Sequence, residues 1–192
     1  MKLIVLTTNN ATTPAEIESI KALVQAGIVV HLRKDDVSEL EQLVQRFSDD
    51  ERKLLSVHGY LEFGLDHGLG GVHLKSHQSE ELIDGFEGRK SKSFHSIDEL
   101  KQSKQLDFGF LSPVFDSISK EDYPTTFDLN QLKTDLIKVN SPVYALGGVT
   151  LDKLDKLAEV GFQGAGILGD FWNKSESERL SFIETYQSLA VA

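Results

Sequence analysis

The stretch PVYALGGVTLDKLDKLAEVGFQGAGIL, residues 142–168, contains one complete copy of the pattern that decides the fold. Its first five residues form a short apolar run, which is typical of a buried β-strand. Gly147 and Gly148 follow, and residues 150–160 then place apolar side chains at helical spacing. A second short apolar run begins at Gly164. A strand, a helix and a further strand in this order predict a β-α-β unit with parallel strands.

The same alternation extends along the rest of the chain. Short candidate strands recur at residues 2–6, 28–32, 53–57, 71–74, 90–95 and 107–111, and helical patterns cover 14–26, about 36–47, 60–67, 78–85, 97–104, 127–139 and 175–190. Eight strand-then-helix units predict one closed (β/α)8 barrel, a compact TIM barrel, that occupies residues 1–192 as a single α/β domain. Because most strand runs are rich in Val, Ile and Leu and show little polar alternation, we expect a parallel sheet that is buried on both faces. A doubly wound open sheet fits less well, since the first strand–helix loop lacks the spaced glycines of a dinucleotide site.

The composition limits the classes of function. The chain has 20 basic and 30 acidic side chains, a formal net charge of −10 and no cysteine. The acidic balance argues against sequence-independent binding to nucleic acid or to an anionic membrane, but it leaves room for a local phosphate site. The absence of cysteine excludes thiol catalysis and cysteine-ligated metal sites. Neither a signal-peptide pattern nor a membrane-length apolar run is visible, so we expect a cytoplasmic protein.

Polar residues at the carboxyl ends of the strands are the first functional candidates, because active sites of such barrels are built there. They are His31, Arg33, Lys34, His58, Gly59, His73, Lys75, His77, Ser93, His95, Gly147, Gly148, Gly169 and Asp170. The guanidinium of Arg33 suits a phosphate or carboxylate, although solvated surface charge explains an Arg-Lys pair equally well. His31, His58 and His73, each taken alone, fit hydrogen-bonded core histidines. The six histidines show no acidic spacing pattern that would predict a metal site.

The loop SPVFDSISK, residues 112–120, gathers three hydroxyl groups and an ammonium around Pro113. Such groups, together with exposed backbone N–H groups, suit a phosphate or pyrophosphate, and an ordinary polar surface loop is the alternative. The pair Gly147-Gly148 lets backbone amides approach an anion at the start of the next helix. Gly169 supplies a matching small residue after the eighth strand. Phosphate sites after strands seven and eight are common in barrels.

Together these segments resemble the thiamine phosphate synthase family, which has the TenI-type thiazole tautomerases as relatives. VVHLRK (29–34), GGVHL (70–74), SFHSIDE (93–99), DFGFLSPVFDSISK (107–120), PVYALGGVT (142–150) and GFQGAGILGD (161–170) follow the order and spacing of the family over nearly the whole chain. The loop is the most specific motif. It keeps the family's Pro113, Phe115 and Lys120 together with two hydroxyl residues, Ser117 and Ser119.

The resemblance implies a transferase that joins hydroxymethylpyrimidine pyrophosphate to thiazole phosphate and releases pyrophosphate, in thiamine biosynthesis. It implies that Arg33 and Lys120 neutralise the leaving pyrophosphate and that Ser93 donates a hydrogen bond to it, which makes these three the catalytic candidates. The further candidates for binding substrate or phosphate are His31, Lys34, His73, His95, Ser117, Ser119, Gly147, Gly148 and Gly169.

The sequence also departs from the family pattern. In the second-strand motif Gln-x-Arg-x-Lys, His31 replaces the glutamine, and Asp35 stands at the lysine position with Lys34 one place earlier. The resemblance implies Mg²⁺, but its usual acidic ligands are replaced by Gly59 and His77. Mg²⁺ prefers hard oxygen ligands, which neither of these two residues supplies through its side chain. The sequence therefore identifies no metal ligands.

Two alternative functions stay open. One is a TenI-like thiazole tautomerase, in which His73 or His95 would replace the histidine that those relatives carry where this loop has Pro113. The other is a non-catalytic protein that binds a phosphorylated ligand in the same pocket. The resemblance also allows a homodimer.

Overall fold

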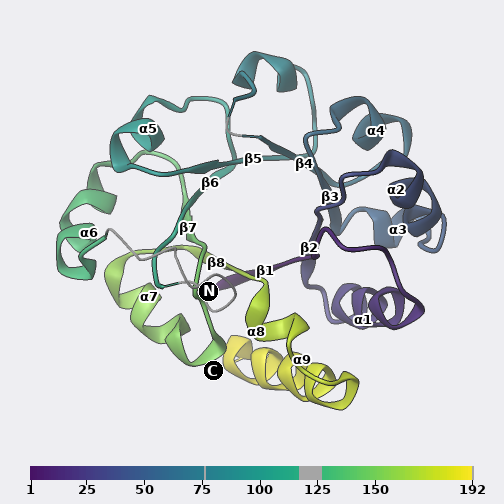
Figure 1. Cartoon of the computed structure of the whole chain (residues 1–192). Helices are drawn as coiled ribbons and strands as arrows, with labels where there is room; N and C mark the ends of the chain where they lie inside the picture. The colour runs from purple at the N-terminus through teal and green to yellow at the C-terminus, as the bar shows by residue number, and fades with distance from the viewer. Residues whose placement is uncertain (76, 117–126, 192) are drawn as a thin grey trace.

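The computed structural model describes residues 1–75, 77–116 and 127–191. Within them, eight parallel strands close into a barrel in which each strand pairs with the next in sequence and β8 pairs with β1. Figure 1 looks along this barrel and shows the strands as an inner ring inside a layer of helices. The (β/α)8 prediction is therefore confirmed. The strands are β1 (Lys2–Leu6), β2 (Val29–Leu32), β3 (Leu55–His58), β4 (Gly71–Leu74), β5 (Arg89–Phe94), β6 (Phe108–Leu111), β7 (Val143–Ala145) and β8 (Gly164–Ile167).

The outer layer consists of short helices. They are α1 (Pro14–Gln25), α2 (Val37–Val44), α3 (Asp49–Arg52), α4 (Leu61–Asp66), α5 (Ile97–Gln102), α6 (Leu129–Asp135), α7 (Leu154–Val160), α8 (Gly169–Trp172) and α9 (Glu176–Val191), with 3-10 segments η1 (Glu80–Ile83), η2 (Leu136–Lys138) and η3 (Leu151–Lys153). The sequence did not predict α3 or α8, and the helix expected near 78–85 is the single 3-10 segment η1. In the part of the chain that the structure describes, no helix combines the length and the apolar character needed to cross a membrane.

Helix α1 illustrates how the sequence sets these elements. The Thr13 side chain accepts a hydrogen bond from the Glu16 amide, and Pro14 occupies the first turn, where its missing N–H costs nothing. Ile20 and Leu23 are fully buried toward the barrel. Burial of this helical face leaves Glu16 at the buried first turn, close to the end of β2.

The barrel interior is divided into an apolar half and a polar half. On the apolar side, Ile4, Leu6, Phe108, Phe110 and Tyr144 form one buried cluster. The Phe108 ring stacks on the Tyr144 ring at 4.3 Å and meets the Phe110 ring edge to face at 5.4 Å. Strand β8 lies beside these rings and contributes glycine: a Cβ on Gly166 would lie 2.8 Å from Phe110. The large aromatic rings therefore fill the space that the glycine strand leaves open.

Strands β2 to β5 turn polar side chains into the other half of the interior. His31, Ser56, His73 and Ser91 are all buried there. At the amino-terminal end of this half, the Arg89 guanidinium donates to the Lys53 and Leu55 carbonyl oxygens at 2.7 and 3.3 Å. Strands β2 to β4 are therefore buried on both faces, as the sequence predicts, but the side chains on their inner face include polar ones. Strands β2, β3 and β4 have four residues each, too few for alternation to stand out in the sequence, and their apolar residues face the helices, whereas the sequence of β5, RKSKSF, is itself mostly polar.

Candidate functional site

Three histidines from neighbouring strands meet in the polar half of the barrel. His31 is the residue before the last in β2, and His58 is the last residue of β3. His73 in β4 lies opposite His58 in the register of the sheet. His31 Nδ1 and His58 Nε2 are 3.1 Å apart, at hydrogen-bonding distance. The His58 and His73 rings stack with centroids 4.1 Å apart and planes inclined by 29°. We call these three residues the histidine layer.

Two serines of β5 hold the deepest part of this layer. Ser91 Oγ lies 2.9 Å from His73 Nδ1, and Ser93 Oγ lies 3.1 Å from His73 Nε2. A neutral imidazole has one donor and one acceptor, and each hydroxyl can complement either. Ser91 is buried, whereas Ser93 is half-buried at the carboxyl-terminal side. Ser93, a catalytic candidate from the sequence, is therefore within hydrogen-bonding distance of His73 Nε2. The sequence analysis did not predict this contact.

Burial keeps the histidine layer neutral. Desolvation is the largest cause that lowers the pKa of His31 and of His58, and it lowers the pKa of His73 to about 3. The charges of Arg33 and Lys75 lower the pKa of His58 further. The layer thus presents three uncharged imidazoles at neutral pH, with cationic side chains above them.

Arg33 lies just beyond β2 and is exposed. The Thr7 hydroxyl accepts a hydrogen bond from the Arg33 amide at 2.8 Å, which ties the end of β2 to the end of β1. The backbone is therefore fixed while the guanidinium stands at the rim of the barrel within electrostatic reach of His58. This is the position in which a cation can meet an anionic ligand at the strand ends.

Lys34, predicted to bind phosphate, points the opposite way. Its ammonium contacts both carboxylate oxygens of Glu16, at 3.0 and 2.9 Å, and donates to the Asn10 carbonyl oxygen at 2.8 Å. The side chain of Lys34 is completely buried in this ion pair. The strand alternation that directs His31 and Arg33 to one side directs Lys34 toward α1. In this arrangement Lys34 fastens α1 to the end of β2 and has no donor left for a ligand.

The two positions that correspond to acidic magnesium ligands hold a different set of groups. Gly59 has φ +77°, and a Cβ there would lie 2.5 Å from Cε of Lys75, so the lysine stem covers the glycine. Gln78 fixes this turn by accepting from the Lys75 amide at 2.7 Å and donating to the Gly59 carbonyl oxygen at 3.2 Å. His77 is exposed. An ammonium, an amide and an imidazole do not make the hard anionic oxygen set that Mg²⁺ requires, so these residues do not fit that ion.

The glycine pair after β7 supports the start of the loop after β6. Gly148 has φ +62°, and a Cβ there would lie 2.2 Å from the Asp116 carbonyl oxygen. The Phe115 amide donates to the Gly147 carbonyl oxygen at 3.1 Å, and Lys153 donates to the Gly148 carbonyl oxygen at 2.6 Å. The loop is therefore seated on the end of β7 up to Asp116. The predicted site residues Ser117, Ser119 and Lys120 lie outside the described residues.

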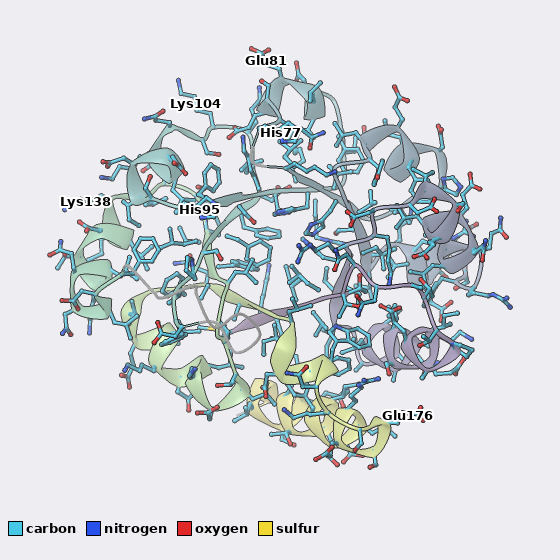
Figure 2. The ribbon with its side chains drawn as sticks, viewed as in Figure 1. His77, Glu81, His95, Lys104, Lys138 and Glu176 are labelled. Atoms are coloured by element: carbon cyan, nitrogen blue, oxygen red, sulfur yellow. The ribbon has the colours of Figure 1, made fainter. Side chains whose placement is uncertain are left out.

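His95 and Gly169 occupy other parts of the rim. The His95 ring nitrogen Nδ1 donates to the Ser112 carbonyl oxygen at 2.9 Å, which leaves its Nε2 as an acceptor on an exposed ring. Figure 2 shows His95 close to β6, and His77 outside the strand ring near η1. Gly169 begins α8. The histidine layer and His95 thus belong to different sectors of the barrel.

Sequence reasoning named His58 and Lys75 as strand-end candidates without giving them a role, and it did not name Ser91. The usable signal was the recurrence of a histidine at the end of a strand or one position before it, as in VVHL, SVH and GVHL. Only the register of β2, β3 and β4 shows that these residues share one layer, since His58 pairs with His73 and His31 pairs with Ser56.

Fold and site together define a (β/α)8 barrel with its polar groups gathered at the carboxyl ends of the strands. The sequence profile described as thiamine monophosphate synthase matches residues 3–170. The chain belongs to this family.

Individual relatives agree at modest identity. A thiamine-phosphate synthase of Lactococcus lactis subsp. cremoris is 23% identical over 168 residues, which cover 79% of this chain and 76% of the relative. One of Latilactobacillus sakei is 33% identical over 117 residues, which cover 56% of this chain and 51% of the relative. The crystal structure of thiamine phosphate pyrophosphorylase from Bacteroides thetaiotaomicron superposes with a TM-score of 0.83 and 28% identity, over 99% of this chain and 98% of that chain.

The buried ion pair predicts a large stability loss in Glu16→Gln. Removal of the carboxylate leaves the buried Lys34 ammonium without its counter-charge, which costs about 3–5 kcal/mol. Glu18→Gln, which removes the partner of the more exposed Lys21, is the matched control and should cost no more than about 1 kcal/mol. Urea unfolding measures both free energies. Equal, small losses in the two variants would show that the Lys34 pair does not hold α1.

The lowered pKa values predict a loss of stability in acid. The unfolded chain protonates its histidines near pH 6.5, whereas the folded histidine layer stays neutral below that value, to about pH 3 for His73. The stabilisation is therefore complete above about pH 6.5 and is lost as the pH falls, by at most about 1.4 kcal/mol per pH unit for each histidine. Urea unfolding between pH 7.5 and 5 should give a steeper dependence for the unmodified protein than for His73→Gln. Identical slopes would contradict the neutral layer.

Proposed function

We propose that the protein is a transferase of the thiamine phosphate synthase type, which joins hydroxymethylpyrimidine pyrophosphate to thiazole phosphate. The observation that carries this proposal is the pair of exposed cations, Arg33 and Lys75, at the rim of β2–β4. The charge of each lowers the pKa of His58, which places both near this residue. The family match and the names of the relatives support the same chemistry. A pyrophosphate leaving group needs this kind of positive rim.

The reaction is a displacement at the pyrimidine methylene carbon. The bond between this carbon and a pyrophosphate oxygen breaks, and pyrophosphate leaves with the electron pair. The lone pair of the thiazole nitrogen then forms the new carbon–nitrogen bond, which gives thiamine phosphate. Proton transfer contributes little to these steps. The protein acts by holding the two substrates together and by stabilising the charge that develops on the leaving group.

In this proposal, side chains of the protein stabilise the negative charge on the leaving pyrophosphate. Arg33, Lys75 and Lys120 neutralise pyrophosphate, and Ser93 donates a hydrogen bond to it. Donation from Ser93 is compatible with its contact to His73, because a serine hydroxyl that donates to the ligand can still accept from the imidazole. No step is assigned to Mg²⁺, since the residues at its usual positions do not suit it.

The second substrate is assigned to the opposite sector of the rim. Ser117, Ser119 and the backbone amides of Gly147, Gly148 and Gly169 would hold the thiazole phosphate. The seating of residues 113–116 on the β7 end brings the start of this loop beside the glycine pair, which supports a shared phosphate site.

A TenI-like isomerase is the second candidate, and the histidine layer favours it. A tautomerisation needs a group that removes a proton from one position and a group that returns one to another. The exposed Nε2 acceptor of His95 offers one proton-transfer group, and His73, which contacts Ser93 through Nε2, is the second residue assigned to this role. This function would use the same barrel mouth without the pyrophosphate leaving group.

The transferase proposal predicts thiamine phosphate formation from the two substrates. Arg33→Ala should lower kcat/KM about 100-fold, because one charged donor to the leaving group is lost, and Lys120→Ala should weaken pyrophosphate binding at low salt with little loss of stability. Arg46→Ala, which removes an exposed arginine beyond the end of α2, is the matched control and should retain full activity. Product analysis by chromatography gives the readout. No product from wild-type protein with both substrates bound would refute the proposal.

The isomerase alternative predicts metal-independent turnover of a thiazole phosphate. His73→Ala and His95→Ala should each reduce this turnover at least about 100-fold, in line with the usual contribution of general acid–base groups. His67→Ala is the control, because this ring stacks on Phe63 in α4. Proton NMR of the product follows the reaction. Full activity in both variants would exclude these proton-transfer roles.

A further inference from the structure

We propose that His31, His58 and His73 form a binding site for a borderline divalent transition metal, with Zn²⁺ as the reference ion. This site does not depend on the transferase proposal, and it differs from a magnesium site in both position and ligand chemistry. It lies inside the barrel, beneath the rim that carries Arg33 and Lys75.

The distances suit a common ion. One nitrogen from each ring can be chosen so that the three atoms all lie within 4.8 Å of one another. Zinc–imidazole bonds of about 2.0–2.1 Å put neighbouring nitrogens about 3.4 Å apart in a tetrahedral site. His31 Nδ1 and His58 Nε2 are already 3.1 Å apart. The other pairs need to close by no more than about 1.4 Å, which side-chain rotation can supply.

The scaffold holds two of the rings in place and leaves the third adjustable. His31 and His73 are 1% and 4% exposed, and Ser91 fixes His73 through Nδ1. A contact to the second ring nitrogen of a ligating histidine is the usual device that orients it. His73 Nε2 would exchange Ser93 for the metal. His58 is only partly buried at the end of β3, so its ring can turn out of the stack with His73. This opening is required, because a nitrogen lone pair lies in the plane of its ring.

The donor set selects the class of ion. Neutral imidazoles bind Zn²⁺, Ni²⁺, Cu²⁺ and Co²⁺ well, whereas Mg²⁺ prefers oxygen. Three protein ligands also leave a coordination position for water or for a ligand oxygen, as in catalytic zinc sites.

The cations at the rim oppose a bound metal, and this has a measurable consequence. Arg33 and Lys75 act electrostatically on His58, but both are exposed and can turn toward solvent. An anion between the metal and these side chains would relieve the repulsion. We therefore expect inorganic pyrophosphate, at a concentration far below that needed to chelate the added metal, to increase metal affinity.

Direct binding tests the site without any substrate turnover. The full chain, made without a polyhistidine tag and stripped with a chelator, is dialysed against Zn²⁺ and, separately, titrated with Co²⁺. We expect one Zn²⁺ per chain and visible Co²⁺ absorption bands of tetrahedral nitrogen ligation, unaffected by millimolar Mg²⁺. His58→Ala should lower the affinity at least 10-fold, and His31→Gln provides a second variant, with folding of each checked by circular dichroism.

His77→Ala and His67→Ala remove histidines outside the layer and should bind as tightly as the unmodified protein. Loss of binding in the His77 or His67 variant, retention of full affinity in folded His58→Ala, or the absence of saturable binding would each overturn the proposal. Displacement of the ion by Mg²⁺ would do the same, since it would indicate an oxygen site. These outcomes are independent of whether thiamine phosphate is formed.

Discussion

The register of β2, β3, β4 and β5 is the constraint on which the site depends. Parallel pairing places His58 level with His73, and His73 level with Ser91, while alternation along each strand turns all three inward. His31 lies level with Ser56 and reaches His58 from the neighbouring strand. A shift of any of these strands by one residue would turn its polar group toward the helices. The barrel closure therefore fixes the chemistry of its interior.

The interior is energetically asymmetric. Phe108, Phe110 and Tyr144 supply apolar burial on one side, and the glycines of β8 give them space. The polar side is stabilised by hydrogen bonds among His73, Ser91 and Ser93, and neutrality of the imidazoles avoids the much larger cost of burying charge. Two imidazoles also rest edge-on or tilted against Phe110. The apolar half thus forms a rigid wall against which the polar groups are positioned.

Much of the fold follows from the sequence because strand and helix periodicity is local. The eight strand segments and the helical pattern that follows the glycine pair after β7 are of this kind. The direction of Lys34 is not, since it depends on Glu16 of α1, eighteen residues earlier. The histidine layer could not be predicted from the sequence either, because each histidine taken alone resembles an ordinary core residue. The sequence identified Lys75 only as a charged residue at the end of a strand. The packing of its side chain against Gly59 is a tertiary contact. These failures concern residues whose roles are set by neighbours distant in sequence.

The family assignment, the cationic rim and the histidine layer support the proposal that ligands with phosphate groups bind at the carboxyl ends of the strands, above the three imidazoles. The most direct measurement follows the ring proton signals of the histidines by NMR during titration with pyrophosphate and with thiamine phosphate. The account predicts saturable shifts of the His58 and His73 signals, whereas the signal of His67, the residue that follows α4, should stay unchanged. Saturable binding that leaves the His58 and His73 signals in place would contradict it, since the ligand would then occupy another part of the molecule.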